Sequence, residues 1–212
     1  AFFYINLSAF FVILFSRNLL KLRFFTLLSS IFIILIISFI NPTAKERVFD
    51  HTLAQMNLVE DKKNNSDEVY IFSKSHNDIY SSAYKIFLDN KIFGVGVKNF
   101  RTLCANPKYH INGKTACNTH PHNTYLQILT ETGLVGFAFL IFILFYFCKY
   151  LLKHLKFRFR GKYYFTDFEI CVLSGIAIYI WPFIPTGNIF NNWLNVAMFL
   201  YLPFLIWSRK LI

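Results

Sequence analysis

The sequence predicts an all-α polytopic membrane protein with about five transmembrane spans, the first of them truncated, and one large extracytoplasmic helical insert. Hydrophobic residues make up 55% of the chain, and 27 of the 212 residues are Phe, a composition outside the usual range of soluble proteins. Residues 24–44, 132–148 and 170–208 contain no charged side chain. Because one span needs about 20 mostly apolar residues, the last of these segments is long enough for two.

The apolar segments divide the chain into three parts. We expect two spans in residues 1–41, a periplasmic loop domain in residues 42–124 and three spans in residues 125–212. Residues 1–16 lack the basic region and the cleavage site of a signal peptide, so we interpret them as the end of a truncated span. The sequence Pro-Thr-Gly-Asn at 185–188, flanked by Trp181 and Trp193, predicts a turn between two spans with aromatic side chains at the interface.

Basic residues predict the orientation. Lys and Arg cluster in residues 17–23, 149–162 and 209–210, whereas the turn at 185–188 has none. The positive-inside rule places these clusters in the cytoplasm and residues 42–124 on the opposite side, the periplasm if this is a bacterial inner membrane. Topology and contact with membrane lipids then explain the net charge of +11, and we expect no nucleic-acid partner.

Two features of the insert carry local structural signals. Residues 77–90 have apolar side chains at helical spacing, which predicts an amphipathic helix that lies at the membrane surface or packs on the core of the insert. The sequence Phe-Gly-Val-Gly follows at 93–96. No Lys-Ser or Lys-Thr comes after it, so we interpret it as a tight turn that needs glycine rather than as a phosphate-binding loop.

Cys104 and Cys117 are both in the insert, whereas Cys148 and Cys171 are at the cytoplasmic ends of expected spans. Only the first pair would meet an oxidising compartment, so we predict a disulfide between them. The alternative is a zinc site that also uses the nearby histidines, among them His120, three residues after Cys117. The distance between the two cysteines in the sequence is not that of a zinc knuckle, and we expect neither a metal nor a cofactor.

His122 begins an apolar segment and is followed by Asn123. A histidine ionises close to neutral pH, so outside the membrane it could act as a general base. The alternative is a polar residue that caps a helix at the interface.

The pattern His122-Asn123, nine residues, Gly133-x-x-Gly136 resembles the signature of the bacterial O-antigen ligase and O-antigen polymerase superfamily. Residues 79–101 are similar to the segment of that superfamily in which an aromatic-led helix ends in a Gly-x-Gly turn, and residues 185–193 are similar to its C-terminal end. The resemblance covers about residues 40–200. It implies a multi-pass inner-membrane glycosyltransferase, of which this chain is the C-terminal half.

The resemblance also implies roles for individual residues. His122 matches the essential histidine, which acts on the acceptor hydroxyl, and His120, Asn123 and Glu131 would support it. Arg47 matches an arginine that holds the diphosphate of the donor, and His76 stands where a second arginine is often found. Lys74 or Arg101 could supply that second charge, although Arg101 could also be a surface residue or a partner of Asp89.

Glu131 lies near the membrane boundary, where an unpaired carboxylate is costly, so we expect it to pair with an arginine or to face water. The chain has no Asp-x-Asp motif, which favours a metal-independent mechanism.

The activity implied by the resemblance is transfer of a glycan from undecaprenyl diphosphate to lipid A core on the periplasmic face. The alternatives are a polymerase that joins repeat units, with a growing glycan as acceptor, and a protein O-oligosaccharyltransferase. A polysaccharide transporter or a structural membrane subunit would be non-enzymatic. A transporter predicts ionisable residues at mid-span depth, and the expected spans contain none.

Overall fold

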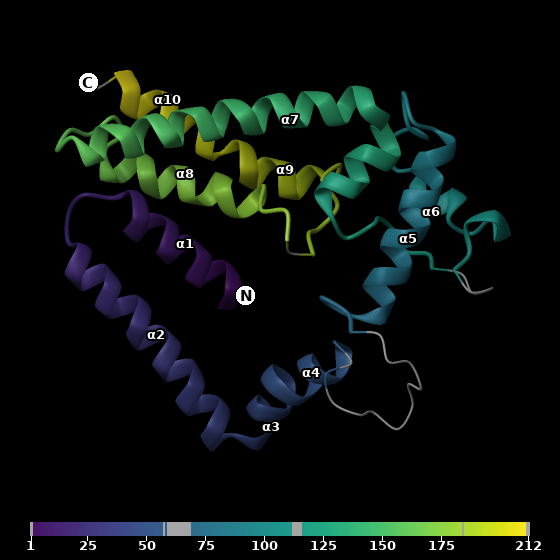
Figure 1. Cartoon of the computed structure of the whole chain (residues 1–212), viewed down its shortest axis with the longest axis horizontal. Helices are drawn as coiled ribbons and strands as arrows, with labels where there is room; N and C mark the ends of the chain where they lie inside the picture. The colour runs from purple at the N-terminus through teal and green to yellow at the C-terminus, as the bar shows by residue number, and fades with distance from the viewer. Residues whose placement is uncertain (1, 57, 59–68, 112–115, 184, 211–212) are drawn as a thin grey trace.

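The computed structural model describes residues 2–56, 58, 69–111, 116–183 and 185–210. All regular secondary structure among these residues is helical (Figure 1). The helices before the histidine segment are α1 Phe2–Phe15, α2 Leu20–Ile40, α3 Pro42–Lys45, the π-helix η1 Glu46–Asp50, α4 His51–Gln55, α5 Lys74–Asp89, α6 Phe100–Leu103 and the 3₁₀-helix η2 Pro107–Tyr109. The remaining helices are α7 Thr124–Phe159, α8 Asp167–Tyr179, α9 Asn192–Phe199 and α10 Tyr201–Lys210.

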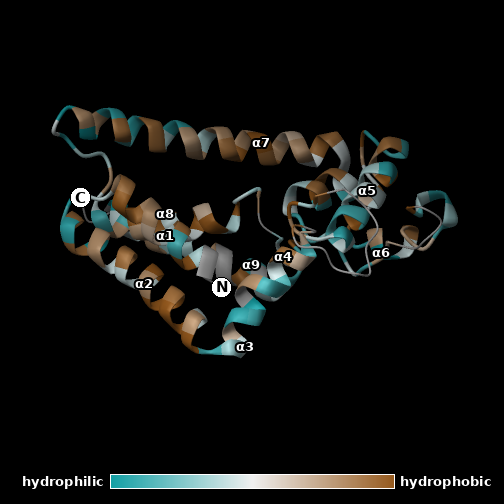
Figure 2. Cartoon of the chain, turned by 60° about the horizontal axis from the view of Figure 1, so that its bottom comes forward, coloured by the Kyte–Doolittle hydropathy of each residue, from teal (hydrophilic) through white to brown (hydrophobic). Residues whose placement is uncertain are grey.

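Among the described helices, α2 and α7 are long and apolar enough to cross a membrane. Figure 2 shows the hydrophobic colouring along both, with hydrophilic residues gathered at the helix ends and in the insert. The 13 residues of α8 would extend only about 20 Å, less than the thickness of a bilayer core of about 30 Å. The membrane character of the sequence is thus matched by two helices of spanning length, and the count of five spans stays a prediction.

Helices α1, α8 and α10 lie together, and the C-terminal part of α7 joins them through a hydrophobic cluster that contains Leu151, while α5 and α6 pack at the N-terminal end of α7 (Figure 1). α2 leads away from α1 towards α3 and α4, which lie on the same side as the insert helices. α7 therefore extends from the helices of the expected insert, α5 and α6, to the group formed by α1, α8 and α10.

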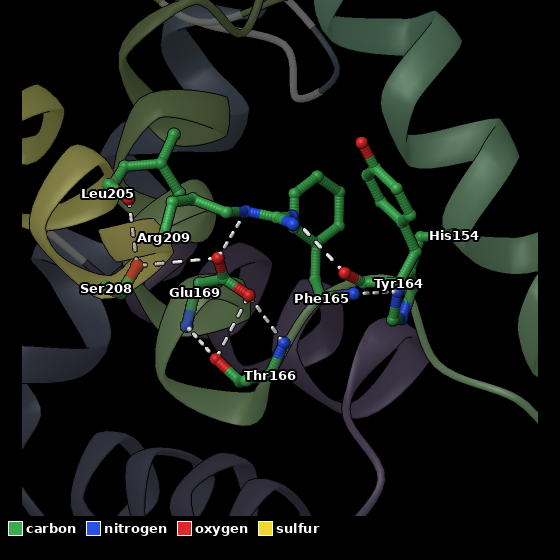
Figure 3. A network of polar contacts seen from close by, with 8 residues as sticks. All are labelled: His154, Tyr164, Phe165, Thr166, Glu169, Leu205, Ser208 and Arg209. Carbon is green, nitrogen blue, oxygen red and sulfur yellow. Dashed lines mark hydrogen bonds and ion pairs between the residues drawn. The ribbon is translucent and has the colours of Figure 1, made fainter. Parts of the chain in front are cut away.

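A polar network joins α8 to α10 (Figure 3). Thr166 and Glu169 form a reciprocal capping box at the start of α8, which satisfies backbone N–H groups that have no partner within the helix. The second carboxylate oxygen of Glu169 pairs with Nε of Arg209 at 2.6 Å and accepts a hydrogen bond from Ser208. Glu169 is fully buried, so these contacts stabilise a charge that would otherwise be costly inside the fold.

His154, on α7, connects two other segments of the chain to its own helix. Its Nε2 donates to the carbonyl of Phe15 at 2.8 Å, and its Nδ1 accepts from the N–H of Phe165 at 3.0 Å. The ring is fully buried. His154 therefore fixes the end of α1 and the loop before α8 against α7, a structural role.

We predict that Glu169→Ala lowers the stability of the purified protein by about 2–4 kcal/mol, because it removes half of a capping box and leaves Arg209 without its partner. Thermal unfolding in detergent would measure the change. Glu46→Ala, an exposed glutamate on η1, is the control and should shift the midpoint very little. Equal midpoints for the two variants would contradict the structural role of Glu169.

α7 is kinked at Gly133, whose φ of 67° and ψ of −162° are not helical. The loop at residues 91–96 fills the kink. The N–H groups of Val95 and Gly96 donate to the carbonyls of Thr130 and Glu131 at 3.1 and 2.9 Å. The kink also exposes the N–H groups of residues 134 and 135, which donate to the carbonyls of residues 91 and 92 at 2.8 and 3.2 Å. The insert and the helix thus satisfy each other's backbone groups.

Glycine is required on both sides of this contact. A Cβ at Gly133 would lie 2.3 Å from the carbonyl oxygen of Ile92, and a Cβ at Gly94 would lie 2.5 Å from the backbone of Glu131. Both glycines also have positive φ, which only glycine adopts at little cost. The turn predicted at residues 93–96 is present, and its reason is this close approach of two backbones.

Gly133→Ala should destabilise the protein far more than Gly161→Ala. Both residues have positive φ, but a Cβ at Gly161 would meet nothing within 4 Å. We therefore expect Gly161→Ala to lower the free energy of unfolding by about 1 kcal/mol. Gly133→Ala should lower it several times as much, because the backbone around residue 133 must also move. Denaturation of the two purified variants would test this, and equal losses would argue against the backbone contact.

The amphipathic segment forms α5, with Ser73 as its N-cap. Of the two positions expected for this helix, at the membrane surface or on the core of the insert, the structure shows packing of its apolar face on the core. The buried residues of this core are Ile79, Ala83, Ile86, Phe100, Cys104 and Tyr109. This packing places the N-terminal turn of α5 beside the segment that leads into α7.

Candidate functional site

His122 directly precedes the N-cap of α7 and has a φ of 56°, in the left-handed region. Asn123 caps the helix, because its Oδ1 accepts from the N–H of Leu126 at 3.0 Å. Its Nδ2 donates to the carbonyl of Pro182 at 3.0 Å, which ties the cap to the segment after α8. A non-glycine residue at positive φ costs of order 1 kcal/mol or more, so the surroundings must hold His122 in place.

Three histidine rings gather at this point. The ring centroids of His120 and His76 lie 4.2 and 5.7 Å from that of His122. His76 comes from the first turn of α5, where Oγ of Ser73 accepts from its backbone N–H and lies 2.8 Å from its Nδ1. The fold therefore brings together residues that are more than forty positions apart in the sequence.

The hydrogen bonds of Asn118 assign the basic nitrogen of His122. Oδ1 of Asn118 accepts from the N–H of Thr119 at 2.7 Å, which turns the amide nitrogen towards His122. That Nδ2 lies 2.8 Å from Nε2 of His122. Since an amide nitrogen can only donate, Nε2 carries the lone pair and is in the form that can accept a proton.

The two neighbouring histidines are held in the neutral form. Burial lowers the pKa of His120, the proximity of His122 lowers it further, and a hydrogen bond to the carbonyl of Thr186 partly opposes both. Burial, and then His122, also lowers the pKa of His76. Both effects disfavour extra positive charge beside His122 at neutral pH.

His120 has partners for both ring nitrogens. Nε2 donates to the carbonyl of Thr186 at 3.3 Å, and Nδ1 accepts from the hydroxyl of Thr119 at 2.9 Å. His120 is therefore held in one tautomer and orientation, which suits a supporting role rather than that of a base.

Cys104 and Cys117 form a disulfide with a Cα–Cα distance of 5.2 Å. The bond ties the end of α6 to the segment that leads to the histidines. No group of three His, Cys, Asp or Glu side chains within the described residues is placed to hold a metal ion.

The expectation that Glu131 pairs with an arginine or faces water is wrong. The side chain is 1% exposed. It accepts from the N–H of Phe100 at 3.3 Å and from Nε2 of Gln127 at 3.1 Å. These two donors satisfy the buried carboxylate, which joins α6 to the first turns of α7.

The three candidate cations lie apart from the histidine rings. Lys74 is exposed in the first turn of α5, two residues before His76, and Arg47 is exposed on η1. Arg101 is exposed on α6 and donates to the carbonyl of Lys98. Within the part of the chain that the structure describes, no hydrogen bond or ion pair joins these cations to the three histidines. Arg101 is a surface residue, because Asp89 pairs with Lys108 at 2.7 Å instead.

Sequence reasoning missed Asn118 and Thr186. Asn118 stands four residues before His122, in a segment without helical or strand periodicity. Thr186 was noted only as part of a turn. The distance of more than sixty residues between Thr186 and the histidines left no local signal for their contact.

The comparison with known families bears on the identity of the chain. A family model described as O-antigen ligase matches residues 1–141, well over half of the chain. The chain belongs to the O-antigen ligase family. No curated protein and no solved structure was found to match. The O-antigen ligase family is a family of membrane proteins. The matched region contains the histidine segment and the kink at Gly133, whereas the turn at 185–189 lies beyond it.

The stability of this O-antigen ligase family protein should fall as the pH drops below about 6.5. The unfolded chain takes up protons at His76 and His120 near that pH, whereas the lowered pKa values delay protonation in the fold. The unfolded state then binds more protons and gains relative stability. His120→Gln should reduce this acid sensitivity, measured as the thermal midpoint between pH 5 and 7.5. The exposed His51→Gln should retain it; a loss in both variants would contradict the assignment.

Proposed function

We propose that the protein transfers a glycan from undecaprenyl diphosphate to a hydroxyl of lipid A core on the periplasmic face of the bacterial inner membrane. Family membership supports the coarser statement, ligase- or polymerase-type glycosyl transfer in the formation of lipopolysaccharide. The observation that carries the finer proposal is the 2.8 Å contact between Nδ2 of Asn118 and Nε2 of His122, which implies a lone pair on that nitrogen at a site before the apolar part of α7.

In the proposed reaction, the acceptor hydroxyl replaces the Asn118 amide at Nε2 of His122. The hydroxyl proton passes to Nε2 while the acceptor oxygen bonds to the anomeric carbon of the donor sugar. The bond between that carbon and the diphosphate oxygen breaks, and undecaprenyl diphosphate leaves. Because a diphosphate is already a good leaving group, the main requirements are a base for the acceptor and positive charge for the departing group.

Lys74 and His76 are the first candidates to bind the donor diphosphate. They share the first turn of α5, whose N-terminus carries the positive end of the helix dipole, and the ring of His76 lies beside that of His122. Arg101 and Arg47 remain proposed contacts for the same group, because guanidinium ions suit phosphate oxygens. Protein cations and the absence of an Asp-x-Asp motif support metal-independent transfer.

The polymerase and protein O-oligosaccharyltransferase alternatives use the same donor and base, so the acceptor distinguishes them. The Cys104–Cys117 disulfide supports a periplasmic insert, because disulfides persist in oxidising compartments.

We expect His122→Ala to reduce transfer by about 10²- to 10⁴-fold, the usual effect of losing a general base. The full-length protein would be reconstituted with an undecaprenyl-diphosphate-linked glycan and offered lipid A core, further repeat units or a protein acceptor in turn. Product would be measured by gel mobility and mass spectrometry.

The exposed His51→Ala serves as the control and should retain wild-type transfer. Lys74→Ala should raise the donor KM if this residue binds the diphosphate. Unchanged transfer by His122→Ala would reject His122 as the base and leave it a structural role, whereas no transfer by the wild-type protein to any of the three acceptors would favour a transporter or a structural membrane subunit. Product with repeat units or a protein alone would reject lipid A core as the acceptor.

A further inference from the structure

The turn at residues 185–189, called the Thr186 turn here, contacts the histidine segment through every polar group of Thr186. The N–H of Thr186 donates to the carbonyl of His122 at 2.7 Å. Its carbonyl accepts from Nε2 of His120 at 3.3 Å, and its hydroxyl lies 2.9 Å from that of Thr124. One residue thus holds three positions of the segment 120–124.

The Thr186 turn is itself anchored to two helices. Nε2 of Gln127, which is fully buried, donates to Oδ1 of Asn188 at 2.8 Å, and the N–H of Ile189 donates to Oε1 of Gln127 at 3.2 Å. The hydroxyl of Tyr4 on α1 donates to the carbonyl of Pro185 at 3.1 Å. The turn is therefore a fixed support for the histidines.

This support acts on the residue that most needs it. The left-handed backbone of His122 is disfavoured for a residue with a Cβ, and its carbonyl is aimed at the N–H of Thr186. Without that N–H, His122 could relax to negative φ. Its ring would then move away from the position set by His76 and Asn118. A displacement of about 1 Å in a reacting group can reduce turnover by about 100-fold.

We propose that Thr186 is a positioning residue for His122, acting through its backbone N–H and, more weakly, through its hydroxyl. The proposal rests on His122 as the base, but it extends the site to a turn outside the region that the family model matches. The site is then built from three parts of the chain: the first turn of α5, the segment before α7, and the Thr186 turn.

The experiment compares kcat and the donor KM of full-length variants in the reconstituted transfer assay. Thr186→Pro removes the N–H, Thr186→Val removes the hydroxyl, and Thr186→Ser keeps both. Thr132→Val is the matched control, because among the described residues that hydroxyl bonds only the carbonyl of Ile128 within α7. We expect Thr186→Ser and the control to keep the wild-type kcat. Thr186→Val should lower kcat by about 3- to 10-fold and Thr186→Pro by about 10- to 100-fold, while the donor KM of every variant stays within about twofold of the wild-type value.

A double variant separates positioning from a general loss of structure. If Thr186 acts through His122, His122→Ala with Thr186→Val should be no slower than His122→Ala alone. Multiplied losses, or wild-type kcat for Thr186→Val and Thr186→Pro, would overturn the proposal. Thermal unfolding checks that each variant is folded, and if the proline variant is not, the valine variant and its double decide.

Unchanged activity in His122→Ala would instead reject the base itself. The proposed function therefore fails by a different result from the one that overturns the role of Thr186.

Discussion

The close backbone contact between Gly94 and Gly133 is the constraint on which the rest of the site depends. Two glycines allow the loop at 91–96 to enter the kink of α7, where it donates to and accepts from backbone groups that a straight helix would satisfy internally. The kink turns the first turns of α7 towards the insert, while the remainder of the helix continues as an apolar span. Buried Glu131 reinforces the same joint through the N–H of Phe100. The histidine segment therefore has a fixed position relative to both the insert helices and the long apolar part of α7.

The electrostatics of the site differ from those of a histidine oriented by a carboxylate. His122 faces an amide and two other histidines, and the carboxylate of Glu131 is used in a backbone-binding role. Burial and proximity lower the pKa of both neighbouring rings, so a proton accepted by His122 would be the main positive charge among the three. Such a charge would form beside the place where the donor diphosphate is proposed to bind, and the departing negative charge would stabilise it.

Local features of the site could be predicted from the sequence because they depend on neighbours in the chain. Apolar spacing predicts an amphipathic helix at residues 77–90, where the structure has α5, Lys74–Asp89, and the two glycines at residues 93–96 predict a tight turn. The pattern from His122 to Gly136 pointed to the family that the comparison identifies. The partner of Glu131 was not predictable, because membrane depth alone suggests a cation or water, whereas the packing of α6 supplies a backbone N–H. Nor could sequence distance show that Asp89 pairs with Lys108 rather than with Arg101.

The sequence by itself determined the membrane character, the helical class and the family, since apolar runs, capping residues and glycines act over a few positions. Tertiary structure alone decided that His76 lies beside His122 and that Thr186 holds the backbone of His122. It also decided that α7 bends at Gly133, because the bend is stable only when another segment satisfies the freed backbone groups. The physical reason is that secondary structure depends on interactions within one segment. The geometry of this site depends on where three separate segments pack.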